Sequence, residues 1–108
     1  RTDEASLDRA WAVARRFRDT EIPALQDTFG WILHRRGESE EALPYLEGAA
    51  QGLPNDPLVQ YHLGKAYEAL ERPEDALAQF RKVVQIAGPE DQREQVIEAR
   101  DLIAATEN

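Results

Sequence analysis

Two adjacent stretches of the sequence repeat each other: PALQDTFGWILHRRGESEEALPYLEGAAQGLPND (residues 23–56) and PLVQYHLGKAYEALERPEDALAQFRKVVQIAGPE (residues 57–90). Both are 34 residues long, they follow one another without a gap, and seven of their positions are identical. The identical pairs are Pro23/Pro57, Gln26/Gln60, Gly30/Gly64, Glu40/Glu74, Ala42/Ala76, Leu43/Leu77 and Gln51/Gln85. A fixed period of this length predicts two copies of one supersecondary unit that stack on each other.

Apolar residues recur with helical spacing in both blocks. They agree pairwise at Leu25/Val59, Phe29/Leu63, Ile32/Ala66, Leu33/Tyr67, Leu46/Phe80, Ala49/Val83 and Ala50/Val84. Steps of three and four residues are typical of amphipathic helices, and no segment alternates as a strand would. Each block is therefore predicted to be two helices that pack through their apolar stripes.

Capping residues mark where the helices begin and end. Asp56 followed by Pro57 offers an N-cap and a proline at the first helical position. Gly37 and Gly88 are expected to close helices in the left-handed conformation, and Pro89 prevents continuation. The helices are predicted near residues 4–18, 23–36, 39–51, 57–70, 73–86 and 91–106.

The start of the third predicted helix carries two further expectations. Ser39 follows Gly37 and Glu38 and is expected to act as an N-cap. Pro44 lies about five residues into the helix, where proline removes a backbone hydrogen bond, so the helix should be distorted there or begin later. The short connections between helices force neighbours to run antiparallel.

These positions resemble a known family, the tetratricopeptide repeat in its bacterial type. Counting Pro23 and Pro57 as position 1, Gly30 and Gly64 match the family's small residue at position 8, and its alanine at position 20 is also present. Position 4, usually a large aromatic, is a departure because it is glutamine in both blocks. The resemblance implies an all-α, right-handed helix-turn-helix solenoid of antiparallel pairs. It implies one domain, residues 1–108, divided into a helix of a preceding partial repeat (1–22), two repeats (23–56 and 57–90) and a C-terminal capping helix (91–108).

A finer resemblance concerns the strings DTFGWILHRRGESEEALPYLEGAA (residues 27–50) and LVQYHLGKA (residues 58–66). They are similar to terminal repeats of bacterial lipoproteins linked to exosortase sorting and exopolysaccharide secretion. This similarity implies that the chain is a structural segment of such a system.

Composition excludes several classes of function. A formal net charge of −8 repels nucleic acid and anionic lipid, although five arginines fall within residues 1–18. The chain has no cysteine, which excludes disulfides, thiolate catalysis and sulfur-based zinc sites. No apolar run approaches the roughly 20 residues of a membrane-spanning helix, so the chain is expected to be soluble, in the cytoplasm or the periplasm. It begins at Arg1 and has no methionine, so we expect a piece of a longer protein.

Neither a metal site nor a catalytic site is predicted. The only histidines are His34 and His62, and a metal would need a third ligand such as Asp27 or Glu68. We interpret the two histidines as lining a surface. The carboxylates fall on polar helix faces beside Arg or Lys, where they act as solvating groups and local ion pairs. The protein is therefore predicted to be no enzyme and to bind no cofactor.

The resemblance also indicates where a partner binds, because the first helix of each repeat lines the concave surface in this family. The corresponding positions are Ala24, Asp27, Thr28, Trp31, His34 and Arg35, then Leu58, Tyr61, His62, Lys65, Glu68 and Ala69. Trp31 and Tyr61 stand out as large aromatics that the packing stripe does not use, and we expect them to be exposed anchors. An alternative is that Trp31 packs under the N-terminal helix or in a homodimer contact.

The protein is predicted to be a scaffold whose partner is a protein or peptide. It would hold a peptide or a helical segment of that partner in its concave groove. The predicted protein-binding residues are Trp31, Tyr61, His34, His62, Lys65 and Asp27. Two alternatives remain open: a structural segment of a larger enzyme or of a secretion or exopolysaccharide-system protein, and a homodimerising adaptor.

Overall fold

The computed structural model describes the backbone of residues 2–107 and the side chains of residues 4–107. Arg1 and Asn108, the outer ends of the two predicted flanking segments, lie outside the described residues. The elements are α1 (Thr2–Ala14), the 3-10 turn η1 (Arg15–Phe17), α2 (Pro23–Arg35), α3 (Ser39–Gly52), α4 (Pro57–Ala69), α5 (Pro73–Ala87) and α6 (Glu94–Glu107). No strand occurs in the range 2–107, and the predicted all-α class is confirmed.

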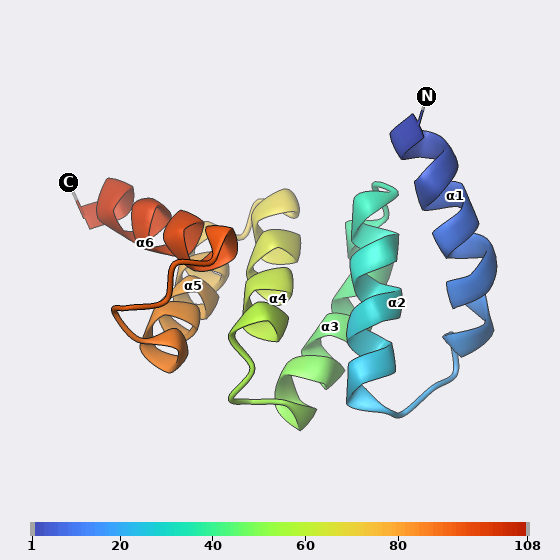
Figure 1. Cartoon of the computed structure of the whole chain (residues 1–108), viewed down its shortest axis with the longest axis horizontal. Coiled ribbons are helices and arrows are strands. Elements are labelled where there is room, and N and C mark those ends of the chain that lie inside the picture. The colour runs from blue at the N-terminus through green and yellow to red at the C-terminus, as the bar shows by residue number, and fades with distance from the viewer. Residues whose placement is uncertain (1, 108) are drawn as a thin grey trace.

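The helices follow one another along the long axis, so that the two ends of the chain lie at opposite ends of the array (Figure 1). The array measures 41 × 32 × 26 Å. The helices pair as α2 with α3 and α4 with α5, while α1 packs on α2, and α6 packs on α5 and α4. The first helices of successive pairs are also neighbours, α2 beside α4 and α4 beside α6. This is the predicted helical solenoid.

Each pair crosses closely at its glycine. A Cβ atom added at Gly30 would lie 2.8 Å from Leu46 Cγ, and one at Gly64 would lie 2.7 Å from Phe80 Cε1. Both distances are shorter than the roughly 3.5 Å of a normal carbon–carbon contact. The two helices of a pair therefore come together only because position 8 has no side chain.

The glutamines that replace the expected aromatic residues connect each pair to the segment before it. Gln60 is buried, and its Nε2 donates to the carbonyl oxygens of Ala50 at 3.3 Å and Leu53 at 3.2 Å, at the end of α3. Gln26 Nε2 donates to the carbonyl of Thr20 at 3.2 Å. The last carbonyls of a helix lack intrahelical donors, so Gln60 supplies a donor at the end of α3.

The caps predicted at Asp56, Gly37 and Gly88 are present. Asp56 Oδ1 accepts from the backbone N–H of Leu58 at 3.0 Å and of Val59 at 3.4 Å. Gly37 and Gly88 have φ angles of +86° and +87°. Glu71 follows α4 as Gly37 follows α2, and its φ of +59° is in the left-handed region, which disfavours a residue with a Cβ.

Two helix boundaries differ from the prediction by more than two residues. The predicted helix 4–18 ends as an α-helix at Ala14 and tightens into η1, as helices often do in their last turn. The predicted helix 91–106 begins three residues later, at Glu94. The carboxylate of Asp91 accepts from the backbone N–H of Arg93 at 3.0 Å and from its Nη2 at 2.6 Å, which holds this segment as a turn.

Two expectations for the start of α3 are corrected. Ser39 is not the N-cap but the first helical residue, after Glu38, and its Oγ lies 2.8 Å from His34 Nδ1. Pro44 does not delay the helix, which begins at Ser39 and continues past the proline to Gly52. The proline ring lies on the exposed side of α3, where it displaces no neighbouring helix.

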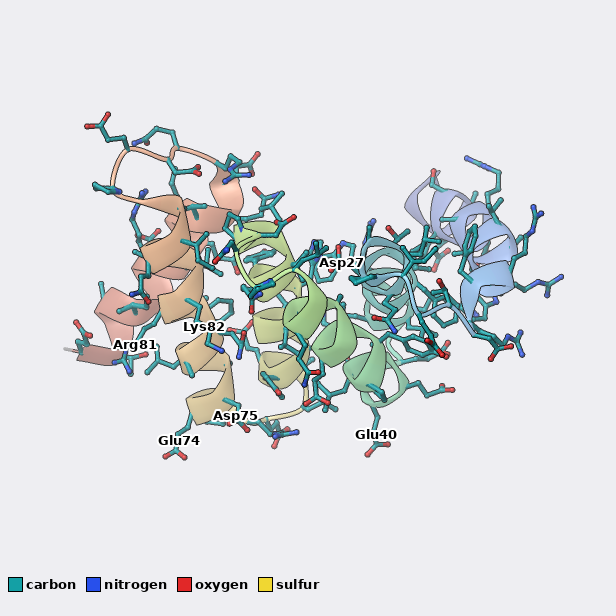
Figure 2. All side chains as sticks on the ribbon, turned by 90° about the horizontal axis from the view of Figure 1, so that it is seen from below. Asp27, Glu40, Glu74, Asp75, Arg81 and Lys82 are labelled. Carbon is teal, nitrogen blue, oxygen red and sulfur yellow. The ribbon has the colours of Figure 1, made fainter. Side chains whose placement is uncertain are left out.

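Several carboxylates lie on exposed helix surfaces, as predicted. Glu40 lies in the first turn of α3, and Glu74 and Asp75 lie in the first turn of α5; all three are exposed and project away from the array (Figure 2). Negative charge at a helix N-terminus is favoured by the helix dipole, so these acids have a structural role. Across residues 2–107, the helices fall short of the length and apolarity that crossing a membrane requires.

Candidate functional site

All six predicted binding residues lie together on α2 and α4. Asp27, Trp31 and His34 come from α2; Tyr61, His62 and Lys65 come from α4. A seventh residue, Glu98 of α6, joins them through hydrogen bonds. We call this surface of α2, α4 and α6 the first-helix face, and its members are Asp27, Trp31, His34, Tyr61, His62, Lys65 and Glu98.

Asp27 and His62 connect α2 to α4. The distance from Asp27 Oδ1 to His62 Nδ1 is 2.8 Å, and both side chains are largely buried. An ionised carboxylate only accepts hydrogen bonds, so the Nδ1–H of His62 donates to Asp27. This hydrogen bond fixes the imidazole ring in position beside Trp31.

Trp31 is the centre of an aromatic stack. Its ring centroid lies 4.1 Å from that of His62 and 4.9 Å from that of His34, with interplanar angles of 23° and 22°. The indole is only partly buried, so part of it remains open to solvent. The aromatic contact between α1 and α2 is made by Trp11, which stacks on Phe29 with 5.4 Å between the ring centroids. The aromatic rings that Trp31 contacts belong to α2 and α4, and these contacts do not support the alternative in which Trp31 packs under the N-terminal helix.

Tyr61 requires a correction, because it is not an exposed anchor. Only 8% of its surface is accessible, and its hydroxyl donates to Glu98 Oε1 at 2.6 Å. Burial, together with the hydrogen bond to Glu98, raises the pKa of Tyr61 to about 12. The sequence predicts a capping helix over residues 91–108, but not the hydrogen bond by which Glu98 of α6 holds the hydroxyl of Tyr61. Tyr61 supports the first-helix face from beneath.

Lys65 is held by two carboxylates. Its Nζ lies 2.7 Å from Glu98 Oε2 and 2.9 Å from Glu68 Oε1. Burial by itself lowers the pKa of Lys65, but the hydrogen bonds to Glu98 and Glu68 outweigh it and the pKa is raised. Burial likewise raises the pKa of Glu98, yet the hydrogen bonds from Lys65 and Tyr61 leave it lowered. Both groups are therefore charged at neutral pH.

His34 is neutral at pH 7. Burial lowers the pKa of its imidazole, and the positive charge of Lys65 lowers it further. The contact with Ser39 Oγ, at 2.8 Å from Nδ1, holds the ring at the end of α2. His34 thus presents an uncharged flat ring beside Trp31.

Glu98 is the functional candidate that sequence reasoning missed. The helical spacing of Glu94, Ile97, Glu98 and Asp101 was the available signal. It would have placed these residues on one face of a helix equivalent to the first helix of each repeat.

Within residues 4–107, no group of three His, Asp or Glu side chains lies close enough to hold a metal ion. The first-helix face offers a flat aromatic surface bordered by charged groups.

Comparison with known proteins places this all-α repeat array in a family. The family model described as "Tetratricopeptide repeat" matches residues 33–105, which is more than half of the chain. The chain belongs to the tetratricopeptide repeat family. Repeats of this family generally mediate protein–protein interaction, and the family is generally a non-catalytic scaffold.

A solved structure agrees in fold. The crystal structure of a tetratricopeptide repeat domain protein from Salinibacter ruber superposes with a TM-score of 0.66 and 24% sequence identity. The match covers 80% of this chain and 96% of the other chain. At this identity the likeness concerns the fold. No curated protein matches the chain.

Proposed function

We propose that the first-helix face binds a peptide or a helical segment of another protein, with Trp31 as the principal anchor. His34 and His62 flank the indole and orient the partner, and Asp27 holds His62 in place. Lys65 supplies charge at the border of the site. Tyr61 acts by supporting the surface and does not touch the partner.

The observation that carries this proposal is the partly exposed stack of Trp31 on two imidazole rings. Each histidine has a hydrogen-bonding partner that fixes its ring, His62 with Asp27 and His34 with Ser39. A partner side chain placed on this stack would gain contact area without ordering the rings first, because they are already ordered. Large flat aromatics of this kind dominate the energetics of many protein interfaces.

A peptide-display selection against the folded chain, followed by titration of the selected peptide, tests this proposal. Trp31→Ala should weaken binding by about 2 kcal/mol, which is roughly 30-fold in Kd, as expected for a central aromatic anchor. Lys65→Ala should have a smaller effect, chiefly on the association rate.

Trp11→Ala is the matched control, because Trp11 is also a partly buried tryptophan stacked on an aromatic ring, but it lies between α1 and α2. It should leave Kd unchanged at a temperature where circular dichroism shows the variant folded. If Trp31→Ala unfolds the chain, His34→Ala replaces it as the test variant. Equal Kd values for Trp31→Ala, Trp11→Ala and the unchanged chain would refute the proposal. If Trp31→Ala converts a dimer into a monomer instead, the face is a homodimer contact.

A further inference from the structure

The first-helix face continues onto an open, shallow surface of α6, which we call the α6 groove. It is lined by five residues of this one helix, Glu94, Ile97, Glu98, Asp101 and Leu102. Ile97 is one of three large apolar side chains that are clearly exposed within residues 4–107, with 37% of its surface accessible. An apolar residue exposed in a groove suggests a contact surface more strongly than an isolated one on a flat surface.

Glu98 shows that this groove and the aromatic stack belong to one surface. Its carboxylate accepts from Tyr61 and Lys65 on α4, so the side of α6 that carries Glu98 adjoins that surface of α4. Glu94 and Leu102 are four residues from Glu98, and Asp101 is three residues away, which puts them next to Glu98 on the helix surface.

The groove has an excess of negative charge. Three carboxylates line it, those of Glu94, Glu98 and Asp101, and of these only Glu98 pairs with a basic side chain, that of Lys65. Lys65 is already shared by Glu98 and Glu68. The ion pairs among residues 4–107 leave Glu94 and Asp101, both exposed, without a basic partner. The nearby arginines are engaged elsewhere, Arg93 with Asp91 and Arg100 with the carbonyl of Gly88.

We propose that the α6 groove selects a basic, amphipathic segment of the partner protein. An apolar side chain of the partner packs against Ile97 and Leu102, and Lys or Arg residues beside it pair with Glu94 and Asp101. This inference rests on the proposed function, because the groove extends the same surface, and it adds the chemistry of the partner. Complementary charge of this kind increases the association rate and excludes acidic partners.

The probe is a fluorescein-labelled synthetic peptide of about 14 residues, with Leu at helical spacing and Lys between them, studied by fluorescence anisotropy. A peptide with Glu in place of Lys serves as the charge control. The variant is Glu94→Gln with Asp101→Asn. Its matched control is Glu40→Gln with Glu74→Gln, which removes the same amount of charge from the first turns of α3 and α5, at residues that do not line the groove.

The Lys/Leu peptide should bind, and it should bind the groove variant at least about tenfold more weakly than the control variant, with the difference shrinking between about 50 mM and 500 mM salt. Equal weakening by both variants, or equal binding of the Glu peptide, would overturn the inference. So would a concentration-dependent dimer that the groove variant abolishes, because a second copy would then fill the groove with its arginine-containing segment 9–18.

The same titrations separate this inference from the proposed function. If Trp31→Ala weakens binding of the peptide and the groove variant does not, the aromatic surface binds partners but the charge selection is wrong. If the groove variant weakens binding and Trp31→Ala does not, the groove selects basic segments but the aromatic anchor is wrong.

Discussion

Replacing Gly64 by alanine tests the close crossing of α4 and α5. The new Cβ would lie 2.7 Å from Phe80 Cε1 and 3.1 Å from Cδ1 and Cζ. Since carbon atoms prefer about 3.5 Å or more, the ring must retreat by about 0.8 Å. Phe80 is 2% exposed and surrounded by core residues, so overpacking should cost about 1–3 kcal/mol. Alanine recovers about 1 kcal/mol through its better helix propensity.

The expected net loss is therefore about 1 kcal/mol, or a fall in Tm of roughly 4–8 °C for a domain of this size. The matched control is Gly48→Ala, whose Cβ would meet only the flexible amide end of Gln26, at 2.8 Å. It should be neutral or slightly stabilising. Combining Gly64→Ala with Phe80→Leu, which removes the ring, should make the alanine favourable relative to Phe80→Leu alone. The reasoning fails if Gly64→Ala raises Tm as much as Gly48→Ala does.

Three further predictions concern stability. Glu71→Gly should raise the free energy of unfolding by about 1 kcal/mol, because it removes a Cβ from a left-handed residue, and a lower Tm would contradict this. Deleting residues 1–22 removes Trp11 and exposes Phe29 to solvent, so Tm should fall by several degrees. A Tm within about one degree of that of the full chain would show that α1 does not contribute to the packing. The lowered pKa of His34 means that the unfolded chain takes up this proton first as the pH falls below the ordinary value of 6.5. Urea unfolding should therefore show a loss of stability between about pH 7.5 and about pH 5.5 that is smaller in His34→Gln, and equal losses would refute this assignment.

The period of 34 residues and the apolar spacing were enough to predict the helices and their pairing. Both are properties of local sequence, because a helix places residues three and four apart on one side whatever the rest of the chain does. Asp56, Gly37 and Gly88 also act as predicted, since caps depend on neighbours within a few residues. Ser39 does not, because His34 of the preceding helix lies close to its hydroxyl.

Most residues of the candidate site could be predicted from the sequence, but not which of their side chains are exposed to solvent. The 34-residue period is enough to assign Trp31, His62 and Lys65 to the first helices of successive units, which the repeat places side by side. That Tyr61 is buried and that Glu98 belongs to the same surface is seen only in the folded chain. These two features depend on the packing of α6 against α4 and α5 and on the hydrogen bonds of Glu98 to Tyr61 and Lys65, contacts between residues far apart in the chain that no local pattern encodes.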